Sequence, residues 1–129
     1  MAFLVDTHTL IWFLTGDKKL SARVVEILRR VEDGEETVII PTIVLAELMY
    51  ICEKKKAELS FQKIIEKLKD SVNYIVYDLD FDTIIKANEI HKILELHDRI
   101  IVASAILTDS KILTKDENIK KSGYVDIIW

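Results

Sequence analysis

The sequence predicts an α/β fold in which a central, mostly parallel sheet of five strands is covered by helices on both faces. Short apolar runs without polar alternation recur along the chain, and such runs are typical of strands that are buried on both faces. Between them, apolar residues recur at the spacing of an amphipathic helix. Strands that alternate with helices in this way favour a three-layer α/β/α arrangement with right-handed crossovers.

The first half of the chain is expected to form two strands and four helices or helical turns. The apolar run 2–5 and the β-branched run 37–40 predict the strands. Ser21 and Ser60 are suitable N-caps, and Gly34 is a suitable stop for the helix before it. The expected elements are, in order, strand 2–5, helix or turn 7–14, helix 20–31, strand 37–40, helix 42–55 and helix 61–68.

The second half is expected to form three strands and three helices. Residues 74–77, 111–113 and 124–128 predict the strands. A helix that begins at Asp80 is expected to present one apolar face, formed by Phe81, Ile84, Ala87, Ile90 and Leu94. A further helix is expected to follow Asp98 through Leu107, and a short helix is expected at 116–121.

Length and composition indicate one globular domain over residues 1–129. Half of the residues are apolar and 31% are charged, which allows a sizeable core in a soluble protein. No apolar run reaches the length of a membrane span, and the N-terminus lacks the basic region of a signal peptide. The only cysteine, Cys52, ends an apolar run and is interpreted as a small buried hydrophobic side chain. These features are consistent with the reducing cytoplasm.

The chain as a whole is acidic, with a formal net charge of −4 and a pI of about 5.4. It therefore lacks the strongly basic footprint that many nucleic-acid-binding proteins carry. Short clusters of lysine and arginine remain, and each by itself is best interpreted as a solvated helix end.

Four acidic residues lie in or beside apolar segments. Asp6 is the only charged residue within residues 2–15, and Glu47 is the only one within residues 38–52. Asp98 comes just before a largely apolar run, and Asp116 closes the segment 111–116 after a short apolar stretch. A lone carboxylate is costly to bury unless something compensates its charge.

These four carboxylates are expected to converge. Ligands of open parallel sheets bind at the carboxyl ends of the strands, and Asp6 and Asp116 come just past the ends of two expected strands. Glu47 and Asp98 lie on helices that can pack toward the same edge. Four carboxylates share one cleft only if a cation offsets their repulsion, which suggests a hard divalent metal with oxygen ligands.

Each acid also has a simpler explanation. Asp6 is suited to an Asx-turn or to the N-cap of the next helix, and Asp116 to the N-cap of the short helix that it begins. Asp98 is suited to a helix N-cap paired with Arg99. Glu47 is harder to explain alone, because it is expected in the middle of an apolar helix with no partner nearby in the sequence.

Four segments resemble, in order, the four motifs of the PIN-domain ribonucleases. They are residues 4–12 (LVDTHTLIW), 42–48 (TIVLAEL), 97–105 (HDRIIVASA) and 112–116 (ILTKD). No single motif is specific, but all four occur in order in a chain of suitable length. The resemblance covers essentially the whole chain and is closest to the VapC-like toxins of bacterial and archaeal toxin–antitoxin pairs.

The resemblance implies a three-layer fold, a Mg²⁺ or Mn²⁺ cofactor and hydrolysis of single-stranded or looped RNA. It also implies a homodimer and a cognate antitoxin that presents a basic side chain to the acids. Asp6 and Asp98 are then the main metal ligands, and Glu47 and Asp116 complete the site directly or through water. Possible supporting roles are a Thr114 hydroxyl that orients a ligand or water, a Thr7 hydroxyl that donates to Asp6 or to phosphate, and an Arg99 that contacts phosphate.

Three other functions remain open at this stage. A PIN-domain nuclease that processes RNA without an antitoxin has the same motifs. A phospho-receiver domain has a similar length and layering, but it needs paired acids after the first strand, where this chain has only Asp6. An inactive binding module is disfavoured because all four acids are present.

Overall fold

A five-stranded parallel sheet forms the centre of this computed structural model, which describes residues 2–55 and 59–129. The strands lie in the order β3-β2-β1-β4-β5, and every neighbouring pair is parallel. This arrangement confirms the predicted fold class. The strands are β1 (Ala2–Val5), β2 (Val38–Pro41), β3 (Tyr74–Tyr77), β4 (Ser110–Leu113) and β5 (Ile127–Ile128).

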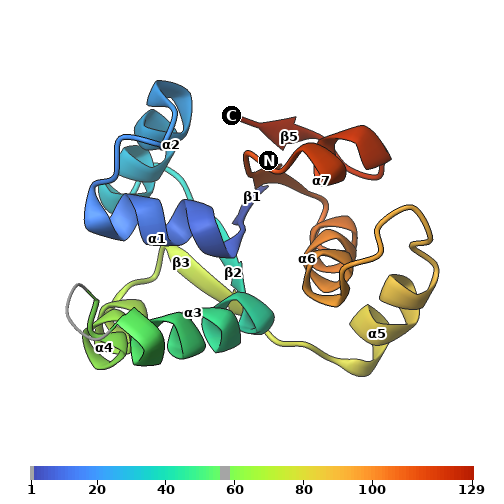
Figure 1. Ribbon diagram of the computed structural model, residues 1–129. Coiled ribbons are helices and arrows are strands. Elements are labelled where there is room, and N and C mark those ends of the chain that lie inside the picture. The colour runs from blue at the N-terminus through green and yellow to red at the C-terminus, as the bar shows by residue number, and fades with distance from the viewer. Residues whose placement is uncertain (1, 56–58) are drawn as a thin grey trace.

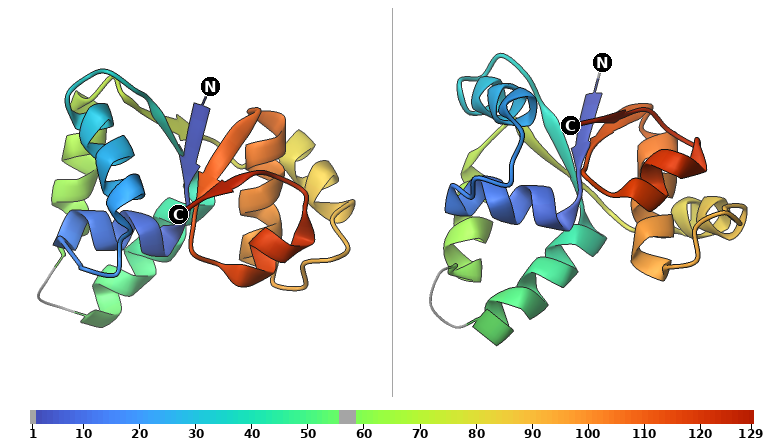
Figure 2. Two further views of the ribbon diagram at one scale, coloured as in Figure 1. Left: turned by 90° about the horizontal axis from the view of Figure 1, so that it is seen from above. Right: turned by 45° about the horizontal axis from the view of Figure 1, so that its top comes forward.

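Helices cover both faces of this sheet. Figures 1 and 2 show α1 to α4 on one side of β1 and α5 to α7 on the other. Right-handed crossovers require this division, because the chain moves from β1 toward β3 in its first half and returns to β4 in its second. The helices are α1 (Thr7–Thr15), α2 (Ala22–Glu32), α3 (Thr42–Lys55), α4 (Phe61–Asp70), α5 (Phe81–Asn88), α6 (Leu96–Leu107) and α7 (Glu117–Ser122).

The core is formed mainly by the three inner strands and the helix faces that pack on them. Leu4, Val5 and Ile40 are fully buried, as the apolar runs predict. Strand β3 differs, because Ile75 and Val76 are 46% and 43% exposed. It is an edge strand with a single neighbour, so its apolar run does not require burial on both faces.

The predicted apolar face of α5 is wrong in part. Phe81 and Ile84 are 78% and 47% exposed, and Leu94 is 90% exposed. Only Ala87 and Ile90 of the predicted face are buried. Two reasons account for this difference: within the helix the buried residues are Thr83 and Ala87, so Phe81 and Ile84 face away from the core, and the helix ends at Asn88, so Ile90 and Leu94 belong to the loop that follows.

The boundaries of two further elements, and the exposure of one residue, differ from what the sequence predicts. Helix α6 begins at Leu96, so Asp98 lies in its first turn and does not precede it. Strand β5 contains only Ile127 and Ile128 of the expected run 124–128. Cys52 is partly exposed, although desolvation raises the pKa of its thiol. Within residues 2–55 and 59–129, no helix has both the length and the apolar character needed to cross a membrane.

The sheet changes its direction of winding at β1. The chain leaves β1 for β2 on one side, and β4 later pairs with β1 on the other side. In open parallel sheets, the crevice outside the carboxyl ends of the strands at such a point is the usual ligand-binding place. Asp6 follows β1 directly and Thr114 follows β4 directly, so both lie at this point.

Candidate active site at the carboxyl edge of the sheet

The connections between elements bring all four predicted acids to the carboxyl edge. Asp6 lies between β1 and α1, and Asp116 lies between β4 and α7. Glu47 lies in the second turn of α3, which begins directly after β2. Helix α6 joins β4 through only Thr108 and Asp109, so it runs back along the strand and places Asp98, near its start, at the same edge.

Asp6 is held from two directions. Its Oδ1 accepts the Thr9 N–H at 3.0 Å and caps α1, so the N-cap interpretation of Asp6 is confirmed. Its Oδ2 accepts the Thr114 hydroxyl. The strand register explains this contact, because Val5 pairs with Leu113 and the next residues of both strands are therefore neighbours. Thr114 is fully buried, which fixes the orientation of the Asp6 carboxylate.

Glu47 finds a partner that is distant in sequence. The buried Thr7 hydroxyl donates to Glu47 Oε1 at 2.8 Å, across the packed helices α1 and α3. The expectation that Thr7 donates to Asp6 is therefore wrong in this structure. The side chain of Thr7 leaves the first turn of α1 toward α3, where it offsets part of the cost of placing a carboxylate in an apolar helix.

Asp98 is the most strongly perturbed of the four acids. It is half-buried, and desolvation together with the negative charges of Asp116, Glu95, Glu47 and Asp6 raises its pKa from 3.8 to about 6. These charges act on Asp98 because the five carboxylates lie near one another. A pKa raised by like charges means that a cation here is stabilised by the same field.

Glu95 is a member of this cluster that the sequence did not reveal. It is the N-cap of α6, and its Oε2 accepts the Asp98 N–H at 2.7 Å. Its Oε1 lies 2.8 Å from His97 Nδ1, and this contact and the charges of Glu47, Glu95 and Asp98 raise the pKa of His97. Glutamate is not a favoured N-cap, so no local signal pointed to this role. The N-cap interpretation of Asp98 is therefore wrong.

Asp116 combines a structural contact with a position at the site. Its Oδ1 accepts the Ile119 N–H at 2.9 Å and caps α7, which confirms the N-cap interpretation. Its own N–H donates to the Thr114 hydroxyl oxygen at 3.0 Å. Thr114 thus links Asp116 to Asp6 through one hydroxyl group. Arg99, by contrast, has a buried Nε that meets no acceptor among the described residues.

The carboxylate oxygens at this site are ligands of the type that a hard divalent cation prefers. Carboxylate oxygens are the ligands that Mg²⁺ and Mn²⁺ prefer, and the mutual repulsion at Asp98 is the charge environment that such an ion relieves. In the part of the chain that the structure describes, however, no three acidic, histidine or cysteine side chains group closely enough to hold one ion together. An ion here would therefore retain several water ligands, as Mg²⁺ commonly does.

Two hollows adjoin the acids. The first, of about 320 Å³, is lined by Asp6, His8, Thr9, Trp12, Lys115 and Asp116. The second, of about 390 Å³, is lined by Lys92, Ile93, Leu94, Glu95, Asp98, Asn118, Lys121 and Ser122. Together they extend the acidic cluster on both sides, toward the first turn of α1 and toward the loop that precedes α6.

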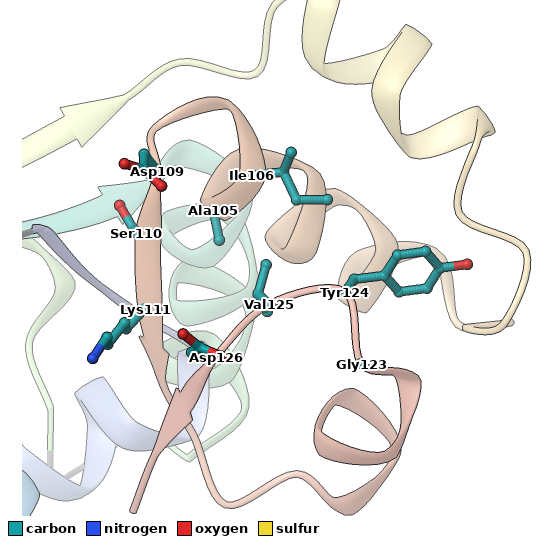
Figure 3. A pocket seen from close by; sticks show the side chains of 9 residues that line it. All are labelled: Ala105, Ile106, Asp109, Ser110, Lys111, Gly123, Tyr124, Val125 and Asp126. Carbon is teal, nitrogen blue, oxygen red and sulfur yellow. The ribbon is translucent and has the colours of Figure 1, made fainter.

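A third hollow lies at the opposite edge and is separate from the acids. It has about 300 Å³ and is lined by the end of α6, the start of β4 and the segment before β5. Figure 3 shows Asp109, Lys111 and Asp126 around it. These residues stand at the amino ends of the strands, so this hollow does not belong to the candidate site.

Comparison with known proteins supports the interpretation of the fold. No curated protein matches the chain. Among solved structures, the VapBC2 complex of Rickettsia felis bound to a promoter DNA fragment matches with a TM-score of 0.76 at 17% identity, over 99% of this chain and 98% of that chain. The DNA-bound VapBC of Salmonella typhimurium matches with a TM-score of 0.75 at 19% identity, over 99% and 97% of the two chains. The sarcin–ricin loop cleaving toxin VapC20 of Mycobacterium tuberculosis matches with a TM-score of 0.65 at 18% identity, over 96% and 97%.

At these low identities the structural similarity shows the shared fold. The sequence itself gives the stronger result, because a model of the PIN domain family matches residues 3–123. That range contains the four resembling segments and the strands and helices that position their acids. The chain belongs to the PIN-domain family.

Proposed function

We propose that this protein is a divalent-metal-dependent endoribonuclease and the toxin of a toxin–antitoxin pair. The observation that carries the proposal is the position of Asp98 near Asp6, Glu47 and Asp116, whose negative charges contribute to its raised pKa. These acids lie beside β1, where the sheet changes its direction of winding. Family membership supports nuclease chemistry, and the similar structures include toxin–antitoxin complexes and a toxin that cleaves RNA.

In this proposal Asp6 and Asp98 hold the metal, and Glu47 and Asp116 complete its surroundings directly or through water. When bound, a divalent ion supplies Lewis-acid chemistry, lowering the pKa of a water and neutralising charge on the phosphodiester. Neighbouring residues position these ligands. Thr114 orients the Asp6 carboxylate, and Glu95 holds the backbone amide of Asp98.

The direct test is cleavage of a labelled RNA panel in Mg²⁺ or Mn²⁺, with single-stranded DNA of the same sequences as the comparison. We expect cleavage of single-stranded or looped RNA, no cleavage after chelation, and recovery when the metal is restored. Cleavage that persists in excess chelator would contradict the proposed chemistry.

The proposed antitoxin would bind in a groove between α1 and α3. This groove has a volume of about 100 Å³, and its residues are Ile11, Trp12, Thr15, Asp17, Lys19, Ile51, Cys52 and Leu59. Its apolar residues Ile11, Trp12, Ile51 and Leu59 suit the apolar face of an amphipathic segment, and Asp17 and Lys19 suit its polar face. An arginine carried on such a segment would relieve the repulsion among the acids and offer bidentate hydrogen bonds to carboxylates.

Co-expression with the product of the adjacent small open reading frame is therefore expected to give a stable complex with suppressed RNA cleavage. Ile51→Glu places a charge in the groove and should weaken the complex by at least tenfold while cleavage by the free protein is retained. Should the neighbour not bind, and should expression of this chain alone leave growth unaffected while the purified protein cuts RNA, an RNA-processing nuclease becomes the better interpretation.

We also propose that the protein forms a homodimer. Met49 and Tyr50 on α3 are 45% and 58% exposed, and contact with a second copy would remove this apolar area from water. Sedimentation velocity at micromolar concentration should show a dimer that Met49→Glu dissociates. A wild-type protein that sediments only as a monomer under these conditions rules the dimer out.

A further inference from the structure

The hollow beside Asp98 carries cationic and amide donors next to the acidic cluster. Lys92, Asn118 and Lys121 line it together with Asp98 and Glu95. Its volume of about 390 Å³ lies within the range of small-ligand sites, about 300–1,000 Å³. Two lysines at the rim of an acidic site are notable in a chain whose net charge is −4.

These lysines are available to a ligand. Among the described residues, neither Lys92 nor Lys121 forms an ion pair, although carboxylates line the same hollow. Both are exposed, and Lys92 Nζ also lies 6.0 Å from the centroid of the Tyr124 ring, a contact that leaves its N–H groups able to donate to an anion. Asn118 adds an amide that donates without charge.

The loop that carries Lys92 is fixed by the fold. The Tyr124 hydroxyl accepts the N–H groups of His91 and Lys92 at 3.1 and 3.2 Å. Figure 3 shows the Tyr124 side chain pointing toward this loop. Ile90 and Ile93 are 1% and 3% exposed, so buried side chains hold the loop on both sides of Lys92.

The segment that carries Lys121 is fixed as well. Ile119 and Ser122 of α7 are buried, and the Ser122 hydroxyl donates to the Ile119 carbonyl at 2.6 Å. Asp116 caps the same helix. The two lysines therefore approach the hollow from two anchored elements, which lowers the entropy cost of gathering donors around an anion.

We propose that this hollow binds the phosphate of a nucleotide that flanks the scissile bond, with Lys92, Lys121 and Asn118 as its donors. The inference rests on the proposed ribonuclease function, because it extends the substrate beyond the phosphate at the acids. A polynucleotide strand carries phosphates at regular intervals, so one phosphate at the metal places the next ones beside it. Cations at this position attract the strand without neutralising the acids that hold the metal.

The test compares lysines that differ only in position. Lys121→Ala and Lys120→Ala remove the same charge from the same helix, but Lys120 does not line the hollow. We expect Lys121→Ala to raise the KM for a labelled RNA oligonucleotide by about threefold or more and Lys92→Ala/Lys121→Ala by about tenfold or more, with kcat within about twofold in both. Lys120→Ala should change KM by less than about twofold. Hydrolysis of bis(p-nitrophenyl) phosphate, which has no flanking phosphate, should not change in any variant.

Binding of a fluorescent single-stranded RNA in metal-free buffer separates the failure of this inference from that of the proposed function. Wild-type protein that cuts RNA, with equal KM values for the Lys121 and Lys120 variants, overturns the phosphate site and leaves the function intact. Wild-type protein that cuts no RNA overturns the proposed function, and equal RNA binding by the two variants then overturns the site too. Competition by millimolar inorganic phosphate that matches competition by an oligonucleotide would show a free-anion site and also contradict the proposal.

Discussion

Asp98→Asn is expected to reduce RNA cleavage at least about 100-fold and, at the same time, to make the metal-free protein more stable at pH 7 to 8. The loss of activity follows because asparagine removes a negative ligand while nearly preserving its shape. The gain in stability follows because the folded state raises the pKa of Asp98, so ionised Asp98 is unfavourable in the folded protein above that pKa.

The size of the stability gain can be bounded. A rise of the pKa from 3.8 to about 6 corresponds to about 3 kcal/mol for a fully buried group. Asp98 is only half-buried, and solvent screening reduces the expected gain to on the order of 1 kcal/mol, or about 3 °C in Tm. Thermal denaturation in chelator at pH 7.5 measures it.

Asp78→Asn is the matched control for this prediction. Asp78 is exposed and follows β3 at the same edge of the sheet, but it is not among the charges that act on Asp98. Asp78→Asn should leave both cleavage and Tm nearly unchanged. If Asp98→Asn lowers Tm as a disrupted hydrogen-bond network would, the account of mutual repulsion is wrong.

Metal dependence is expected to change with pH through the ionisation of Asp98. Below about pH 6 the carboxyl is protonated, and a cation must displace that proton before it binds. The half-saturating Mn²⁺ concentration should therefore fall by up to about tenfold per pH unit as pH rises from 5 to 6, and then level off. Above pH 6 the ionised ligand is present without further cost.

Cleavage rates at fixed RNA and varied Mn²⁺, measured from pH 5 to 8, give this profile. His97 is another group in the cluster whose pKa is raised, chiefly through its contact with Glu95. In His97→Gln the change in half-saturating Mn²⁺ concentration that ends near pH 6 should remain, because it reflects ionisation of Asp98. In Asp98→Asn the metal binding that is left should no longer show this step. A step lost with His97 and retained without Asp98 contradicts the assignment.

The sequence predicted the fold well because its strongest signals are local and repeated. The strands Ala2–Val5 and Val38–Pro41 and the caps Ser21 and Ser60 were confirmed, since short apolar runs and hydroxyl caps act through near neighbours. The α5 region was less predictable. Apolar residues continue at helical spacing after Asn88, but the chain leaves the helix there, and only tertiary packing decides that Ile90 is buried and Leu94 is not.

The candidate site, too, could be predicted only in part. The positions of Asp6 and Asp116 could be predicted because both follow strands, and their capping contacts coexist with a place at the cluster. The partner of Glu47 could not, because Thr7 lies 40 residues away and meets it only through packing of two helices. Glu95 was also missed, since a glutamate N-cap has no distinctive local pattern. The roles of these residues in catalysis stay predictions until metal binding is measured.

We propose that the acids at the carboxyl edge form one centre for a divalent cation. Isothermal titration of Mn²⁺ into the protein at pH 6, in two buffers with different ionisation enthalpies, tests it most directly. We expect binding that releases part of a proton, and an affinity at least about tenfold weaker in Asp6→Asn/Asp98→Asn with little proton release. Equal Mn²⁺ affinity in the wild-type protein and in this double variant would contradict it.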